Sequence, residues 1–283
     1  IKAASNAGAD GIKFQIFKSS TLYADNAGKS DYLKKSGIED DINTMFSKLS
    51  MPSQIIPELV EECKKNQINF MASSFSVDDA KQVDQFVDAH KIASYEINHY
   101  RLLEYVAKTE KPIIISTGAY TYEKIDFAIK NIRKYNNKIA ILQCTASYPT
   151  TLEDLNLRVI KQYIEKYNLP VGFSDHSIEP FIGPIVAVGQ GAKIIEKHFT
   201  LNKNKIGPDH KFAIEPNELK LLVDMIRSAE KTLGSKDKKI ENIEYELKIF
   251  AKRSLQAIKD IKKIYILWMK KCNKLEAICY IFS

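Results

Sequence analysis

Three short stretches in the second half of the chain decide its fold class: Lys138-Ile-Ala-Ile-Leu-Gln-Cys144, Pro170-Val-Gly-Phe-Ser174 and Lys193-Ile-Ile-Glu-Lys-His198. Each is a short run of apolar and β-branched residues, which is typical of a buried strand. Amphipathic stretches separate such runs along the chain. Strands that alternate with helices indicate βα units and a parallel sheet.

Four more runs of the same kind precede these three, at residues 11–17, 68–73, 91–94 and 112–116. Helical patterns lie near 53–66, 100–109 and 121–135. Seven strands are one fewer than the eight of a TIM barrel, and about 250 residues is the typical length of that fold. The sequence therefore predicts an α/β fold, a TIM (β/α)8 barrel that lacks its first strand.

The composition, 45% hydrophobic and 27% charged residues, is that of an ordinary globular protein. No stretch approaches the roughly 20 uninterrupted apolar residues of a membrane helix, which excludes a membrane partner. The net charge of +7 lies in residues 248–283, so residues 1–247 are neutral overall. A nucleic-acid-binding protein carries its basic surface on the folded body, so this pattern excludes nucleic acid as well.

The four cysteines, Cys63, Cys144, Cys272 and Cys279, show no paired spacing of the CxxC kind. A chain of this length has enough core to fold without disulfides, so we expect reduced thiols and a cytoplasmic protein. Cys144 follows an apolar strand without an evident base, and we expect it to be buried and inert.

Polar residues gather at the carboxyl ends of the predicted strands. Side chains at positions i and i+2 of a strand share a face, so such pairs can project together into one pocket. A TIM barrel places its chemistry at this end of the strands. The residues in question are Lys13, Gln15, Ser73, Ser94, Glu96, Ser116, Thr145, Ser174, His176, Glu196 and His198.

His176 and His198 follow consecutive predicted strands. Neighbouring strands lie about 4.8 Å apart, so two imidazoles at their tips can share one divalent metal and leave positions open for water or substrate. Lys13 and Lys91 lie among the serine hydroxyls, and this set predicts a site for a small, multiply charged anion. A rival interpretation makes one lysine a Schiff-base nucleophile, as in a metal-free aldolase.

Several motifs occur in order and resemble the N-acetylneuraminate (sialic acid) synthase family, which includes legionaminic and pseudaminic acid synthases and spore-coat polysaccharide relatives. The resemblance covers roughly residues 1–263. It is carried by the segments Ala-Gly-Ala-Asp-Gly-Ile-Lys-Phe-Gln (7–15), Lys-Pro-Ile-Ile-Ile-Ser-Thr-Gly (111–118), Cys-Thr-Ala-Ser-Tyr-Pro-Thr (144–150), Val-Gly-Phe-Ser-Asp-His-Ser (171–177), Glu-Lys-His-Phe-Thr (196–200) and Gly-Pro-Asp-His (207–210).

The resemblance implies a transferase that condenses phosphoenolpyruvate (PEP) with an N-acetylated amino sugar to give a nonulosonic (sialic-type) acid and phosphate. It implies a divalent metal, usually Mn²⁺, on His176 and His198, with Mg²⁺ and Co²⁺ as alternatives. It also implies roles for further residues. The catalytic set is Glu96, Lys13 and Lys91, and the substrate-binding set is Lys13, Gln15, Ser73, Lys91, Ser94, Ser116, Tyr148, Ser174 and Asp209.

The same resemblance implies a small antifreeze-like (SAF) domain after the barrel and a domain-swapped homodimer. We expect the barrel at residues 1–240, a linker and the start of the SAF domain at 241–263, and a divergent tail at 264–283. The family's first strand and its glutamate are expected to be absent and the SAF domain to be truncated, which would impair the dimer. A frameshift after Lys263 is our hypothesis for the tail.

Two alternatives to an active synthase stay open at this stage. One is a non-catalytic remnant or structural protein of a polysaccharide or spore-coat locus. The other is the lysine-type aldolase. The sequence leaves the acceptor sugar undecided between N-acetylmannosamine and its deoxy or diacetamido relatives, because these sugars share the reacting atoms.

Overall fold

The computed structural model describes residues 1–23, 28, 40–251 and 253. Its contacts divide the chain into two compact units, Ile1–Gly234 and Ser235–Ser283. The expected tail at 264–283 lies outside the described residues, and so do residues 254–263 of the expected SAF segment. The domain boundaries proposed from the sequence therefore stay predictions.

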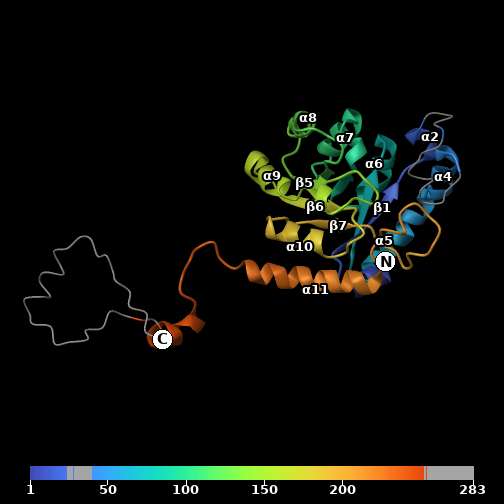
Figure 1. Cartoon of the computed structure of the whole chain (residues 1–283). Helices are drawn as coiled ribbons and strands as arrows, with labels where there is room; N and C mark the ends of the chain where they lie inside the picture. The colour runs from blue at the N-terminus through green and yellow to red at the C-terminus, as the bar shows by residue number, and fades with distance from the viewer. Residues whose placement is uncertain (24–27, 29–39, 252, 254–283) are drawn as a thin grey trace, which may run out of the picture. The chain divides into compact units, whose positions relative to one another are not determined.

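The first unit is built on seven parallel strands whose order in the sheet is their order in the sequence. Each of the seven predicted strands is confirmed. The strands are β1 (Gly11–Ile16), β2 (Asn69–Ser74), β3 (His90–Ile92), β4 (Ile113–Ser116), β5 (Ile139–Cys144), β6 (Val171–Asp175) and β7 (Ile195–Lys197). Within the described residues, the sheet is a curled half-barrel of the TIM-like kind, as predicted (Figure 1).

Helices follow the strands and cover the outside of the sheet (Figure 1). The three predicted helical stretches correspond to α5, α7 and α8. In the described part of the first unit the helices are α1 (Lys2–Asn6), α2 (Ser19–Leu22), α4 (Ile42–Leu49), α5 (Ile56–Lys65), α6 (Val77–Val83), α7 (Tyr100–Lys108), α8 (Tyr122–Ile132), α9 (Val159–Tyr167), α10 (Ile182–Gly189) and α11 (Pro216–Leu233). Short 3-10 turns lie at Ser53–Ile55, Asp84–Phe86, Ser94–Glu96 and Glu153–Leu155.

Helix α7 shows why these segments are helical. Its buried residues Leu102, Leu103 and Val106 recur at the spacing of one helix face. The Nδ1 atom of His99 accepts a hydrogen bond from the Leu102 amide at 3.2 Å, which satisfies one free donor at the helix start. The helix therefore begins at its cap and turns one apolar stripe to the sheet.

The main core lies between the outer face of the sheet and this helix layer. Strand residues such as Ile113, Ile141 and Phe173 are fully buried in one cluster with Ile125 and Ile160 of the helices. Most outward positions in the middle of the sheet are thus apolar, and the alternate positions face the inside of the half-barrel. The fold separates a dry outer layer from an inner surface that is free to carry polar groups.

The second unit contains a 3-10 turn at Asn242–Glu244 and helix α12 (Tyr245–Phe250) in its described part. A capping box between Glu241 and Glu244 starts this segment. Across both units, none of the described helices combines the length and the apolar character that crossing a bilayer requires.

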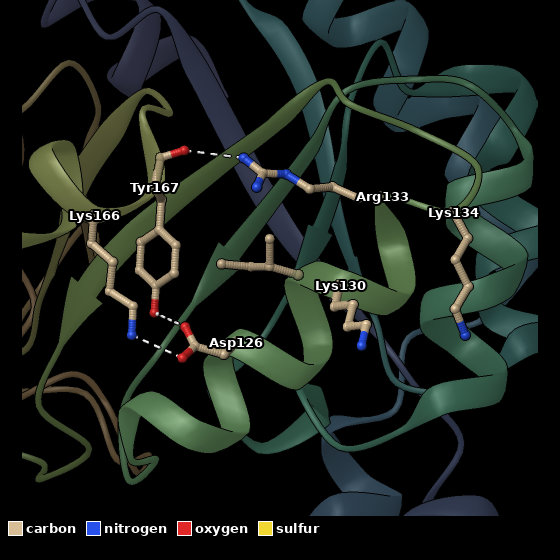
Figure 2. A pocket seen from close by; sticks show the side chains of 7 residues that line it. Asp126, Lys130, Arg133, Lys134, Lys166 and Tyr167 are labelled. Atoms are coloured by element: carbon tan, nitrogen blue, oxygen red, sulfur yellow. Dashed lines mark hydrogen bonds and ion pairs between the residues drawn. The ribbon is translucent and has the colours of Figure 1, made fainter.

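Helices α8 and α9 are joined on the outside of the first unit by a polar network (Figure 2). The Asp126 carboxylate accepts from Lys166 Nζ at 2.8 Å and from the Tyr167 hydroxyl at 2.8 Å. Arg133 donates to the carbonyl oxygen of Tyr167 at 3.0 Å. These contacts belong to the helix layer and lie apart from the polar interior described below.

Gly172 of β6 lies against the backbone of Ile194, the residue that precedes β7. A Cβ atom at this position would overlap the carbonyl oxygen of Ile194 and would lie 2.5 Å from Leu142 Cδ2. Because one of these neighbours is backbone, the strands would have to move apart to admit a methyl group. The glycine is therefore required by packing between β6 and β7.

Gly172→Ala is expected to lower the free energy of unfolding by about 1–3 kcal/mol, the usual cost of overpacking a core. Gly189→Ala is the matched control, because nothing described lies within 4 Å of a Cβ there and the residue is exposed at the end of α10. It should change the free energy by less than about 1 kcal/mol. Urea unfolding of both variants measures the difference, and equal stabilities would refute the close-packing account.

Candidate active site

The inner face of the half-barrel collects the polar residues that the sequence places at strand ends. Parallel pairing sets Gln15 beside Ser73 and Ser73 beside Lys91, and it sets Cys144 beside Ser174 and Ser174 beside Glu196. Register partners point to the same face of a sheet. The ladder thus brings residues from distant parts of the chain to one surface.

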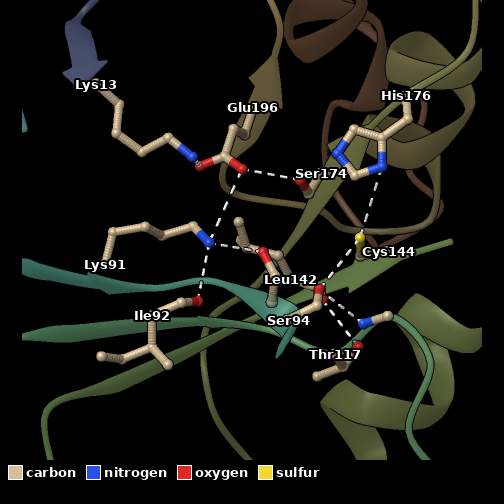
Figure 3. Close-up of polar contacts among 12 residues, drawn as sticks. Lys13, Lys91, Ile92, Ser94, Thr117, Leu142, Cys144, Ser174, His176 and Glu196 are labelled. Atoms are coloured by element: carbon tan, nitrogen blue, oxygen red, sulfur yellow. Dashed lines mark hydrogen bonds and ion pairs between the residues drawn. The ribbon is translucent and has the colours of Figure 1, made fainter. Parts of the chain in front are cut away.

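The carboxylate of Glu196 is the centre of this surface (Figure 3). Its Oε2 atom lies 3.0 Å from Lys13 Nζ, and its Oε1 atom lies 3.9 Å from Lys91 Nζ. Ser174 Oγ donates to Oε1 at 2.8 Å. Burial raises the pKa of this carboxyl, but the two ammonium groups outweigh burial and hold the pKa well below its usual range. Two cations around one anion leave this group with one net positive charge.

Lys91 is the most deeply buried member of the group. Its side chain is 1% exposed, and Nζ donates to Ser116 Oγ at 2.7 Å and to the Ile92 carbonyl at 3.0 Å. Burial lowers the pKa of Lys91 to about 8, while the nearby Glu196 carboxylate opposes that shift. At neutral pH the group is still mostly an ammonium ion, which donates to two acceptors and faces the Glu196 carboxylate.

A second set of contacts leads from this cluster toward the histidines. Ser94 Oγ accepts from the Gly118 amide at 3.0 Å and donates to Cys144 Sγ at 3.5 Å. The sulfur lies 3.8 Å from His176 Nδ1. Cys144 is buried, as predicted, and burial raises the pKa of its thiol, which disfavours the reactive thiolate.

Ser73 is buried, and its hydroxyl finds no hydrogen-bond partner among the described residues. A buried polar atom of this kind is costly unless a ligand or water completes it. Gln15 is exposed at the end of β1, where no described contact fixes its side chain. Ser73 and Gln15 therefore both have polar groups available at the carboxyl ends of the strands, as a binding role would require.

The expectation that Ser94 and Glu96 share a strand face is wrong. Strand β3 ends at Ile92, and residues Ser94–Glu96 form a 3-10 turn in which the two-residue alternation no longer applies. Ser94 turns into the interior, whereas Glu96 is half-buried beside Asp79 of α6. Burial, with a further contribution from Asp79, raises the pKa of Glu96 to about 7.

His176 and His198 follow β6 and β7, and their ring centroids are 5.4 Å apart. His176 Nδ1 lies 3.0 Å from the Thr145 carbonyl oxygen, and His198 Nδ1 lies 3.4 Å from Asp209 Oδ2. A carbonyl oxygen can only accept, so His176 Nδ1 carries the proton. Burial lowers the pKa of His176 to about 4, with the neighbouring His198 adding to the shift, and the ring is therefore neutral.

This arrangement fits two ligands of a divalent metal. A metal-bound histidine typically donates its other ring N–H to a carbonyl or carboxylate, and Thr145 and Asp209 occupy those positions. The Nε2 atoms are then left for a metal. Among the described residues, no group of three or more His, Cys, Asp or Glu side chains forms a full ligand set, so the pair by itself is an incomplete site.

Tyr148 covers the two imidazoles. Its ring centroid is 4.2 Å from that of His176 and 6.1 Å from that of His198. Phe212 lies behind them, 5.0 Å from His198 and 5.8 Å from Tyr148. Tyr148 and Asp209, both predicted to contact substrate, therefore lie at the histidine pair.

Glu196 is the site residue that sequence reasoning left out of its binding and catalytic sets. The signal was present, because Glu196 and His198 stand two residues apart on one strand face. The other three histidines have structural partners: His90 pairs with Asp84 at 3.0 Å, His99 caps α7, and Thr200 Oγ1 lies 2.7 Å from His210 Nδ1.

Known proteins resemble this chain in both sequence and structure. The sequence model described as the NeuB family matches residues 1–238. The spore coat polysaccharide biosynthesis protein SpsE of Bacillus subtilis is 39% identical, over 93% of this chain and 74% of that protein. A pseudaminic acid synthase of Campylobacter jejuni is 40% identical, over 93% of this chain and 77% of the enzyme.

A solved structure shows the same architecture. The N-acetylneuraminic acid (sialic acid) synthetase of Leptospira borgpetersenii, in complex with citrate, superposes with a TM-score of 0.79 at 30% identity. The superposition covers 88% of this chain and 83% of the other. The matched family, the sequence identities and the shared fold agree, and the chain belongs to the NeuB family of nonulosonic acid synthases.

Proposed function

We propose that this chain condenses PEP with an N-acetylated amino sugar, N-acetylmannosamine or a deoxy or diacetamido relative, to give a nonulosonic acid and phosphate. The observation that carries the proposal is the continuous polar network at the mouth. It joins Lys13, Lys91, Ser116, Ser174 and Glu196 beside the His176–His198 pair. Family membership supplies the reaction class.

The lysine cluster is the proposed PEP site. A phosphate and a carboxylate on one small molecule need closely spaced cations, and Lys13 and Lys91 share a single carboxylate partner. The unpartnered Ser73 hydroxyl and the hydroxyls of Ser116 and Ser174 add donors around them. These groups would fix PEP so that its C3 faces the sugar aldehyde, a gain from orientation.

The histidine pair is the proposed sugar end of the site. His176 and His198 would hold a divalent metal, Mn²⁺ in the first instance, and such a metal supplies Lewis-acid polarisation of the sugar aldehyde. Tyr148 and Asp209, which adjoin the imidazoles, would contact sugar hydroxyls. Gln15, exposed at the end of β1, would complete these contacts.

Glu96 is the proposed base for the water that adds to PEP C2. The π pair of the PEP C2–C3 double bond forms the new bond to the aldehyde carbon. The aldehyde C=O π pair moves to its oxygen, which takes a proton from water, and C2 is left with positive character. Water then forms a C–O bond there, its proton passes to Glu96, and phosphate departs from the tetrahedral intermediate. A base with a pKa of about 7 is well matched to neutral conditions, because it is substantially ionised yet still basic.

The proposed reaction is tested by phosphate release from PEP with the full chain, Mn²⁺ and a panel of N-acetylated hexosamines. Product formation by at least one sugar, lost in His176→Ala and His198→Ala, is the expected result. Folded protein that consumes no PEP with any sugar would favour the remnant or structural-protein reading instead.

Lys91→Met should weaken PEP binding by about 10- to 100-fold, because hydrogen bonds from a charged donor contribute roughly 1.5–3 kcal/mol. Lys108→Met is the control, since that lysine pairs with Glu104 on the exposed surface of α7. Isothermal titration calorimetry measures both. A dissociation constant for Lys91→Met within twofold of the wild type would contradict the assigned site.

The pH dependence of kcat tests the role of Glu96. A base must be deprotonated, so kcat should rise as the pH increases through about 7 and then level off. Asp79→Asn removes the neighbouring carboxylate that raises this pKa, and the midpoint should move to lower pH. Glu96→Gln should lower kcat by about 10²- to 10⁴-fold and abolish this limb. An unchanged profile in Glu96→Gln would assign the base elsewhere.

The lysine-type aldolase has one observation in its favour, the pKa of about 8 at Lys91. An imine needs a free amine, whereas Lys91 Nζ donates to Ser116 and to the Ile92 carbonyl and faces Glu196. Borohydride reduction with pyruvate followed by mass spectrometry separates the two readings. The synthase reading predicts no adduct on Lys91.

A further inference from the structure

A second ion pair lies at the ends of β6 and β7, on the opposite face of the sheet from the polar network. Lys197 Nζ lies 2.6 Å from Asp175 Oδ2, and the two side chains are 3% and 0% exposed. Alternation along each strand turns Ser174 and Glu196 inward and Asp175 and Lys197 outward. The pair therefore does not line the pocket and is no part of the proposed binding surfaces.

The Asp175–Lys197 ion pair lies where the β6–β7 ladder ends. Asp175 and Lys197 are the last register partners of β6 and β7. His176 and His198 come one residue later on their respective chains, beyond the final rung. No backbone ladder between these two strands holds the histidines at their separation. The Asp175–Lys197 ion pair adds a side-chain link to the last backbone rung, directly before the two histidines.

The pair also organises the segment that follows His176. Lys197 Nζ donates to the carbonyl oxygens of Ser177 at 2.9 Å and Glu179 at 3.2 Å. Asp175 Oδ1 accepts from the Ser177 amide at 2.8 Å. The three donors of the ammonium thus have three acceptors, and His176 is bracketed by residues bound to one cation.

Stability alone is a weak reason for such a pair. Removing two charges from water is costly, and replacing a buried ion pair with apolar residues is often neutral or stabilising. The pair instead fixes the relative geometry of the two strand ends. A charge-assisted contact fixes the separation and rotation of two strand ends more narrowly than apolar packing does.

We propose that Lys197 and Asp175 are positioning residues that hold the imidazoles of His176 and His198 in the relation needed to act on one ligand. This inference rests on the proposed function for the identity of that ligand, a divalent cation. The positioning geometry itself comes from contacts within the chain and does not depend on which ligand is bound. With the pair removed, the Ser177 and Glu179 carbonyl groups lose the ammonium that holds them. The His176 backbone keeps its bond from the Thr150 amide, but its ring is then less firmly oriented toward the Thr145 carbonyl.

The test uses the full chain with the double substitution Asp175→Asn and Lys197→Met, which removes both charges and leaves neither unpaired. The matched control is Asp126→Asn with Lys166→Met, which removes the ion pair between α8 and α9 (Figure 2). Circular dichroism confirms folding. If the double variant at the site does not fold, Lys197→Arg replaces it, since arginine keeps the charge but moves the donors.

Three measurements are made on each protein: Mn²⁺ binding by electron paramagnetic resonance, PEP binding by calorimetry, and the His176 tautomer by ¹⁵N NMR without metal. The site variant should bind Mn²⁺ about 10- to 100-fold more weakly. It should keep PEP affinity within twofold, because Ser174 and Glu196 remain inside the ladder. Its His176 signal should average between tautomers. The control should match the wild type in all three measurements.

The outcomes separate this inference from the proposed function. Wild-type Mn²⁺ affinity together with an unchanged His176 tautomer in the site variant would overturn the positioning role. Equal losses of Mn²⁺ and PEP binding would also overturn it, since they would indicate a general structural role. If the wild type itself binds no Mn²⁺, the metal assignment fails, and the tautomer comparison alone decides the positioning role.

Discussion

The carboxylate of Glu196, held between Lys13 and Lys91, is the interaction on which the described inner surface depends. Lys13 and Glu196 stand on β1 and β7, the first and last strands of the sheet. Their contact requires a sheet curled far enough for its two end strands to face each other. The same contact offsets part of the repulsion between the two ammonium groups, which would be more costly in a buried setting without the carboxylate. Curvature and electrostatics therefore support each other at this point.

At the ends of β6 and β7, the alternation of side chains places different groups on the two faces of the sheet. Inward positions place Ser174 and Glu196 beside the two lysines, and the next inward residues are the two histidines. Outward positions place Asp175 and Lys197 under the helix layer. Because successive side chains point to opposite faces, a one-residue slip of either strand would exchange the two sets. The same register therefore determines both the polar inner surface and the buried ion pair behind it.

Strands and inward-facing residues were accessible from the sequence because both follow from local periodicity. The seven strands, the three helical stretches and the burial of Cys144 agree with expectation. The error at Ser94 and Glu96 has a local cause. The chain leaves β3 after Ile92 and tightens into a 3-10 turn, which no apolar pattern announces. Glu196 was omitted because its role appears only when its two lysine partners, which lie far away in sequence, are brought beside it.

The sequence by itself determined the parallel α/β architecture, the strand ends that carry polar groups, and the family to which the chain belongs. These properties depend on short-range patterns and on the order of the motifs, both of which are contained in the linear sequence. Only the tertiary structure decided that Glu196 joins Lys13 and Lys91, that Tyr148 covers both imidazoles, and that Glu96 lies beside Asp79. Each of these depends on distances across the curled sheet and on how deeply the groups are buried. The shifted pKa values of Glu196, Lys91 and Glu96 follow from those two quantities.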